Sequence, residues 1–344
     1  MSEVKSGTTR RKLDAVDIAK FIGSLLILAM HCEALSDYHE NAGLALTIIT
    51  RWTVPFFFIS SAYFLFRKGV NGRIDKKQLT RYISRIGMLY LCWFIYNLPS
   101  IYYERLYQEN LSDLKTWFEF IKFSLFSATF FGSWYLTSSI FSAWLMYMLS
   151  RRFKTTTMIR MTSVIYILVV LTSVYKGILP EKLTDILLFF CFPLNLLTGC
   201  FYFAIGKYIA ENETKITDVL SGKKAALLFI GFYLIYAAEV ILSKHSGVFG
   251  SSDAAFSTAP LACALFILCL QSKIQCAKSV LYRKLSIIIY CCQGNVLILN
   301  SFFRKVLKSS VAACVLSVVV ALAISFAVLY IQKHKDWKWA GYLA

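Results

Sequence analysis

Five ionisable side chains lie within one apolar stretch near the start of the chain, residues 13–35. The stretch is long enough to span a membrane as a helix, and it carries Asp14, Asp17, Lys20, His31 and Glu33. Ionisable groups inside a membrane span are costly, so they usually mark a polar pathway or a site. Lys20 and His31 fall on nearly the same helix face, about 16 Å apart along the axis. The pattern predicts a helix that lines a channel, with a cation at one depth and an imidazole at another.

His31 is the histidine best placed for chemistry, because the other histidines fall in predicted loops or in the tail. An imidazole that titrates near neutral pH can take a proton from an acceptor hydroxyl, as acyl transfer to a sugar requires. A carboxylate could hold its tautomer, and Glu33, Glu239 and Asp253 are the candidates. The alternative is a histidine that only hydrogen-bonds to a neighbouring helix.

Lys20 also has two interpretations. It could pair with Asp17 one turn earlier, with its stem extended toward the lipid headgroups. It could instead bind the phosphates of a donor that enters from the cytoplasm. Arg81 and Arg85 lie one turn apart at the start of the third predicted span and would extend such a cationic site.

The segment GSWYL, residues 132–136, opens the fourth predicted span. Aromatic residues at a span end usually belong to the interfacial belt. The functional alternative is that Trp134 and Tyr135 form a wall of the acceptor site beside His31, with Glu33 nearby.

The composition is that of a polytopic membrane protein. Hydrophobic residues make up 58% of the chain and charged residues only 16%, whereas soluble domains carry about 25% charge. The net charge of +18 comes mainly from short loops between apolar segments, which fits the positive-inside rule better than nucleic-acid binding. The ten cysteines show no CxxC and no paired spacing, so we expect neither a disulfide framework nor a metal site. Walker A, GxGxxG, HExxH and GxSxG motifs are also absent from the sequence.

Hydropathy predicts an all-α membrane protein, a polytopic bundle of about ten transmembrane helices. The predicted spans are residues 13–35, 46–66, 83–103, 133–149, 158–176, 185–209, 225–243, 254–271, 284–302 and 309–332. Loop charge places both termini in the cytoplasm, although the hairpin with Arg304, Lys305 and Lys308 would then lie outside. The expected organisation is a cytoplasmic lead-in (1–12), one membrane domain (13–332) and a cytoplasmic tail (333–344).

Several motifs, in this order, resemble those of the acyltransferase-3 family of integral-membrane O-acyltransferases. The family typically has an arginine, ten residues and a histidine in its first span, and this chain has Lys20 and His31 at that spacing. Further matches are VPFFFISSAYFL (54–65), the basic entry 81–85 with the aromatic run that follows, GSWYL (132–136) and LSIIIYCCQ (285–293). The chain departs from the family at Lys20, at Ser133 and Gln293, where many members have histidine, and at Ala62, where glycine is usual.

The resemblance implies a multi-pass enzyme of the cell (inner or cytoplasmic) membrane that moves an acyl group, usually acetyl, from acyl-CoA to a hydroxyl of a cell-envelope or exported glycan. His31 would be the general base, and Lys20, with Arg81 and Arg85, would hold the CoA phosphates. The implied partners are the lipid bilayer, acetyl-CoA or another acyl-CoA, and a glycan acceptor, with no metal. The alternative is a non-catalytic transporter or glycan-binding membrane protein on the same scaffold.

Overall fold

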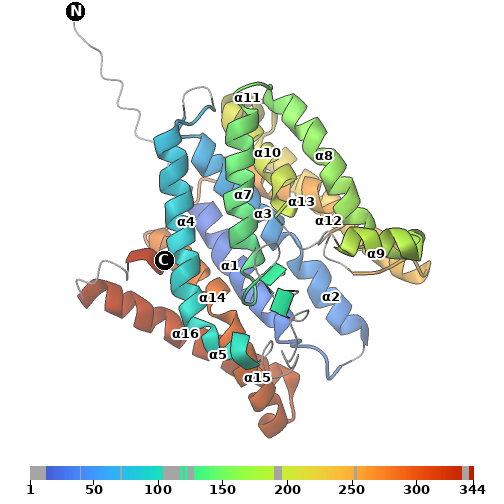
Figure 1. The fold of residues 1–344 in the computed structure, drawn as a ribbon, viewed down its shortest axis with the longest axis vertical. Coiled ribbons are helices and arrows are strands. Elements are labelled where there is room, and N and C mark those ends of the chain that lie inside the picture. The colour runs from blue at the N-terminus through green and yellow to red at the C-terminus, as the bar shows by residue number, and fades with distance from the viewer. Residues whose placement is uncertain are drawn as a thin grey trace, which may run out of the picture.

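A computed structural model describes residues 13–38, 40–69, 72–103, 117–118, 121–122, 128–189, 196–251, 254–334 and 341–344 (Figure 1). These residues form helices joined by loops and contain no β-strand, which confirms the predicted all-α class. The lead-in (1–12) and residues 335–340 of the tail lie outside the described ranges.

The helices of the first half are α1 (Asp14–His31), α2 (Glu40–Thr50), α3 (Thr53–Phe66), α4 (Lys76–Tyr96), α5 (Leu98–Ile101), α7 (Trp134–Leu149) and α8 (Thr155–Leu171). A short 3-10 helix, η2 (Lys176–Ile178), precedes the rest: α9 (Glu181–Phe189), α10 (Thr198–Glu211), α11 (Glu213–Val219), α12 (Gly222–His245), α13 (Thr258–Gln271), α14 (Ser279–Cys291), α15 (Gln293–Leu307) and α16 (Ser310–His334).

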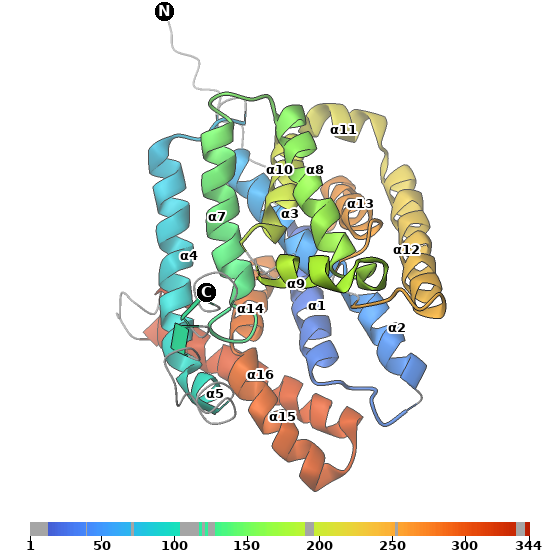
Figure 2. The same cartoon turned by 45° about the vertical axis from the view of Figure 1, so that its right-hand side comes forward.

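Helix α1 occupies the middle of the bundle (Figures 1 and 2). It packs most extensively against α14 and also contacts α2, α3, α13 and α16. Its apolar residues Val16, Ile27 and Leu28 are buried. Gly23 lets α3 come close, since a Cβ at this position would lie 3.1 Å from Cγ2 of Thr53. The helix that carries the predicted stripe is therefore enclosed by other helices over much of its surface.

Helix α3 packs next to α1, and most of its residues are buried. Its phenylalanines at 56, 57 and 58 are all buried, and α10 packs along it. Gly206 of α10 makes this possible, because a Cβ there would lie 2.4 Å from the carbonyl oxygen of Ile59. The apolar sequence of α3 thus packs against protein.

The predicted count of about ten spans is not confirmed. Within the described residues, three helices are long and apolar enough to cross a membrane: Asn41–Phe66, which joins α2 and α3, then α12 and α16. The pair α14 and α15 would make a fourth, but it bends by 66°. Other predicted spans correspond to shorter or divided helices, and the predicted sixth span, 185–209, is shared between α9 and α10.

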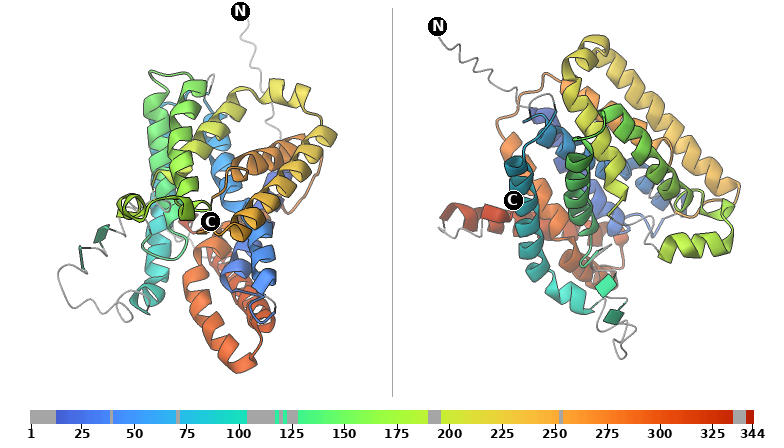
Figure 3. Two further views of the ribbon diagram at one scale, coloured as in Figure 1. Left: turned by 90° about the vertical axis from the view of Figure 1, so that its right-hand side faces the viewer. Right: turned by 45° about the horizontal axis from the view of Figure 1, so that its top comes forward.

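Two helix breaks lie against each other at one end of the bundle, where α15 and α16 gather (Figures 1 and 3). One break is at Asn97, between α4 and α5, and the other is at Cys292, between α14 and α15. The Asn97 side-chain amide donates to the Cys291 carbonyl at 3.0 Å, and the Asn295 amide donates to the Tyr96 carbonyl at 2.7 Å. Side chains thus bond carbonyls that the interrupted helices leave without helical donors.

Candidate functional site

A cavity of about 410 Å³ lies at the His31 end of α1. Residues of α1, α3, α7, α8, α10, α14 and α15 line it, together with Thr50 and Arg51 and the segment 128–132 that precedes α7. The polar and aromatic side chains that matter most below are His31, Arg51, Trp134, Tyr202, Tyr290 and Gln293. A mostly apolar cavity with a few convergent polar groups is the usual form of a small-molecule site.

His31 is the last residue of α1 and is half-buried in this cavity. Its ring stands edge-on against Phe131, with centroids 4.5 Å apart. The contact with Phe131 covers one side of the imidazole, and helix α1 ends at His31. The structure therefore places the predicted general base in a cavity, as a catalytic role requires.

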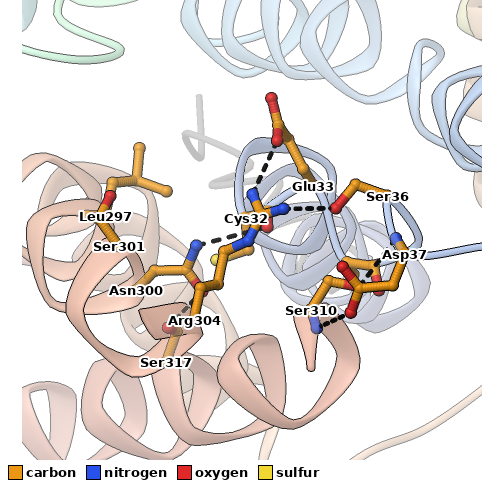
Figure 4. Close-up of polar contacts among 11 residues, drawn as sticks. Cys32, Glu33, Ser36, Asp37, Leu297, Asn300, Ser301, Arg304, Ser310 and Ser317 are labelled. Carbon is orange, nitrogen blue, oxygen red and sulfur yellow. Dashed lines mark hydrogen bonds and ion pairs between the residues drawn. The ribbon is translucent and has the colours of Figure 1, made fainter. Parts of the chain in front are cut away.

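Glu33 lies outside the lining of this cavity. It adopts a left-handed backbone conformation, with φ of 49°, and its carboxylate pairs with Arg304 of α15 at 2.8 Å (Figure 4). Arg304 also donates to the Ser36 hydroxyl at 2.6 Å. Glu33 thus holds the loop after α1 against α15, and the predicted substrate-binding role stays a prediction.

Glu239, another candidate for orienting His31, has different partners. Its carboxylate accepts from the backbone N–H groups of Phe256 and Ser257, at 2.8 and 2.9 Å, and from the Tyr175 hydroxyl at 3.0 Å. It therefore caps the start of α13. Asp253, the third candidate, lies outside the described residues.

Lys20 lies among charges, one turn after Asp17 on α1. It interacts electrostatically with Asp17, Arg85 and Arg283, and its ammonium lies 5.7 Å from the centre of the Phe64 ring. Asp17 also pairs with Arg283 of α14 at 3.8 Å. Lys20 thus lies within electrostatic reach of Arg85 and also of Arg283, which the sequence analysis missed. The predicted role of Lys20 and Arg85 in binding the donor stays a prediction.

Arg81 lies apart from this cluster. It lines a shallow surface hollow with Lys76, Lys77 and Thr80 in the first turns of α4. A larger hollow of about 790 Å³ is lined by Arg73, Lys154, Lys207 and Glu211, among others. Neither hollow shares a lining residue with the His31 cavity.

Trp134 and Tyr135 are adjacent but take different positions. Trp134 lines the His31 cavity, and its predicted role in the acceptor site stays a prediction. Tyr135 lies behind the lining, where its hydroxyl hydrogen-bonds to that of Ser61 at 2.9 Å and donates to the Phe57 carbonyl at 3.3 Å. Tyr135 therefore supports α3, on which the wall is built, and does not itself line the cavity.

Arg51 is a lining residue that the sequence analysis did not single out. It lies inside the predicted second span, so the rule that flagged α1 would also have found it. Pro55 explains the interruption between α2 and α3 here, because a proline has no N–H to donate to the Arg51 carbonyl.

Tyr290 and Gln293 come from the two sides of the α14–α15 bend. The Tyr290 hydroxyl donates to the Gly132 carbonyl at 3.0 Å and so fixes the loop before α7. Gln293 is the first residue of α15 and has no exposed surface. Neither its side-chain nitrogen nor its side-chain oxygen has a hydrogen-bond partner among the described residues. The segment LSIIIYCCQ (285–293), in which Gln293 stands where histidine was expected, thus contributes Tyr290 and Gln293 to the lining of the cavity that holds His31.

In the part of the chain that the structure describes, no group of three or more His, Cys, Asp or Glu side chains is placed so that it could hold a metal ion.

Comparison with known proteins gives two relatives, both named amino-acid racemase and both from Enterococcus faecalis. One is 22% identical over 341 residues, which is 94% of this chain and 47% of the relative; the other is 25% identical over 217 residues, 60% of this chain and 29% of the relative. The chain thus spans less than half the length of the curated relatives it matches. No solved structure matches it significantly.

The remaining comparison covers nearly the whole chain. The sequence model of the acyltransferase-3 family, described as an acyltransferase domain, matches residues 13–330. This range includes His31, Lys20 and the α14–α15 bend. The chain therefore belongs to the acyltransferase-3 family.

Proposed function

We propose that this protein is an integral-membrane O-acyltransferase that transfers an acyl group, in the simplest case acetyl, from acyl-CoA to a hydroxyl of a cell-envelope or exported glycan. The observation that carries the proposal is the position of His31. It lies in a cavity with aromatic walls, in a chain whose family is that of acyltransferases. Aromatic faces suit the apolar faces of a sugar ring, and the imidazole suits its hydroxyl.

The proposed reaction needs one base and one leaving group. His31 takes the proton of the acceptor hydroxyl while the hydroxyl oxygen attacks the acyl carbon of the thioester. The new C–O bond forms as the carbonyl electron pair moves onto the carbonyl oxygen. When this intermediate collapses, the C–S bond breaks and the CoA thiolate leaves, taking the proton back from the imidazolium. The products are an O-acyl ester and free CoA.

The donor side of the proposal rests on the charges around Lys20. Lys20, Arg85 and Arg283 bring three positive charges to one place against the negative charge of Asp17. An excess of positive charge attracts the phosphates of CoA, and arginine binds phosphate through paired N–H groups. Arg81, in its surface hollow, would act on approach of the donor and not in this cluster.

The direct test is glycan acylation in cells that carry the wild type or His31→Ala at matched expression. We expect the ester content of the envelope glycans, measured by mass spectrometry, to fall to the level of a deletion strain in the variant. His245→Ala is the matched control, because His245 is exposed at the end of α12. Wild-type ester content in His31→Ala cells would exclude the catalytic role.

A second candidate function is binding or transport of a glycan or other polar solute without chemistry. The observation that favours it is the bent α14–α15 pair, because interrupted helices with a half-helix N-terminus at a central site are typical of transporters. Proteoliposomes separate the two proposals. Solute uptake without consumption of acyl-CoA would favour transport, whereas release of free CoA with ester formation would favour the transferase.

We also propose that the protein resides in the cell (cytoplasmic) membrane with both termini in the cytoplasm. Its apolar helices and its family indicate a membrane protein, and the loop charges of the sequence supply the orientation. Protease protection of terminal epitope tags in spheroplasts tests this, since tags in the cytoplasm survive until the membrane is opened.

A further inference from the structure

The side-chain amide of Gln293, a residue that lines the cavity, is buried without a hydrogen-bond partner among the described residues. The side chain has 0% exposure, and neither Nε2 nor Oε1 has a hydrogen-bond partner among the described residues. A buried polar group without a partner is destabilising relative to a bonded one, so a ligand that bonds it gains affinity. The amide has two such atoms, one donor and one acceptor, and Gln293 is among the residues that line the same cavity as His31.

The fold holds this amide in place. Gln293 directly follows the 66° bend at Cys292. The next residue, Gly294, packs so closely that a Cβ would lie 2.6 Å from Oδ1 of Asn97 and from Oγ of Ser100. Asn295 is tied on both sides, because its amide donates to Tyr96 and its oxygen accepts from the backbone N–H of Ser100 at 3.1 Å. The backbone on the α15 side of Gln293 is therefore pinned to the break between α4 and α5.

The two unsatisfied atoms specify what a matching ligand must offer. A thioester carbonyl can accept from Nε2 but offers nothing to Oε1. A single alkyl group satisfies neither atom. Two hydroxyls on neighbouring carbons satisfy both, because one donates its proton to Oε1 while the oxygen of the other accepts from Nε2. Adjacent hydroxyls on a ring are the common feature of pyranoses.

We propose that Gln293 is a specificity-determining residue that binds two adjacent hydroxyls of a pyranose acceptor in the His31 cavity. This inference rests on the proposed function, because it takes the pyranose to be the acceptor of the acyl group. Trp134 and Tyr202 provide aromatic surface in the same cavity, on which the apolar face of such a ring can lie. The hydroxyl that reacts at His31 is a different one from the pair held by Gln293.

The test compares methyl pyranosides with their mono-deoxy analogues. The purified wild type in detergent is assayed with acetyl-CoA and the methyl glycosides of glucose, galactose, mannose and N-acetylglucosamine. For the best acceptor we expect removal of either hydroxyl of the bound pair to lower kcat/KM about 10- to 100-fold, since a buried group built to bond a hydroxyl is then left unpaired. In Gln293→Leu, which has similar volume and no polar atom, the same deoxy analogues should react within about threefold of the parent sugar.

Gln332→Leu is the matched control, because Gln332 lies near the end of α16 and is absent from the cavity lining. It should retain the wild-type preference for the parent sugar. A Gln293→Leu enzyme that still discriminates as the wild type does would overturn the inference.

Binding separates this inference from the proposed reaction. Thermal stabilisation of the protein by each glycoside is measured without acetyl-CoA. If the wild type acylates no sugar but is stabilised by a parent glycoside more than by its deoxy analogues, and Gln293→Leu loses this difference, the Gln293 site stands and the transferase proposal fails. If neither binding nor turnover distinguishes the analogues in the wild type, the Gln293 inference fails.

Discussion

The two ends of α1 carry the two halves of the stripe found in the sequence, and they differ in how their polar groups are satisfied. At the Lys20 end, opposite charges lie together: Asp17 pairs with Arg283, and Lys20 interacts with both. At the His31 end there is a cavity, and the amide of Gln293 in it has no partner among the described residues. One end is a charge cluster, and the other has polar atoms that a ligand could satisfy.

This difference indicates which substrate group each end suits. A cluster with excess positive charge attracts phosphates over several ångströms and tolerates imprecise placement. A neutral amide beside aromatic rings selects by hydrogen-bond geometry and shape. We therefore expect substitutions at the Lys20 end to change the affinity for the donor, and substitutions at the His31 end to change turnover.

Replacing His31 by glutamine should have the largest effect. Glutamine keeps a polar side chain of moderate size but cannot take a proton, so kcat should fall about 100- to 10,000-fold. The KM for acetyl-CoA should change little, because the donor phosphates are held at the other end of α1. Steady-state kinetics of the purified protein measures both values. If KM rose while kcat stayed the same, His31 would be a binding residue and the contrast between the two ends would be lost.

Replacing Lys20 by glutamine should give the opposite pattern. A charged hydrogen bond to phosphate contributes about 1.5–3 kcal/mol, so the KM for acetyl-CoA should rise about 10- to 100-fold with little change in kcat. Lys20→Arg is the informative control. It keeps the charge and restores the residue usual in the family, so it should bind acetyl-CoA at least as well as the wild type. If Lys20→Arg also lost affinity for acetyl-CoA, the role of Lys20 would be to pack against Phe64 and not to bind phosphate.

Gly294→Ala should destabilise the His31 end without removing any polar group. The added Cβ would meet Asn97 and Ser100 at 2.6 Å, and overpacking of this kind typically costs about 1–3 kcal/mol. Thermal unfolding in detergent measures the effect. Gly231→Ala is the matched control on α12, where a Cβ meets nothing within 4 Å and alanine favours the helix by about 1 kcal/mol. Equal melting temperatures for the two variants would contradict the close packing of the two breaks.

The sequence could predict those site residues that are ionisable and lie in an apolar helix. The rule that polar groups inside a span are costly found His31 and Lys20 on α1, and both lie where a role is possible. The same rule, applied to the second predicted span, would have found Arg51. These residues stand out because each is unusual among its own neighbours in sequence.

The rest depends on contacts between distant segments. The bend at Cys292 has no proline, and the Cys291 carbonyl next to it is bonded by Asn97, 194 residues earlier in the chain. Arg304 was an anomaly of the predicted topology, yet its charge is matched by Glu33 across 271 residues. The count of about ten spans stays a prediction, because hydropathy does not show whether an apolar segment forms a helix long enough to cross a membrane. Helix α13, for example, is apolar but has 14 residues.

The smallest predicted effect concerns Asp37, which ties the loop behind His31 to α16. Its carboxylate accepts from the backbone N–H of Ser310, the first residue of α16, and hydrogen bonding with Ser310 lowers the pKa of Asp37 below its usual value (Figure 4). Ser310 in turn donates to the Ala34 carbonyl at 2.9 Å. The ionised carboxylate at a helix N-terminus is favoured by the helix dipole as well.

A pKa that is lower in the folded state means that the charged form stabilises the fold above the unfolded pKa, about 3.9, and that this contribution is lost as pH falls through the folded value. Asp37→Asn should therefore melt slightly below the wild type at pH 7, and the two should converge as the pH falls below about 3.9. Melting curves in detergent across this range check the prediction. A difference that persisted unchanged at the lowest pH would show that the amide geometry, and not the carboxylate charge, holds the loop against α16.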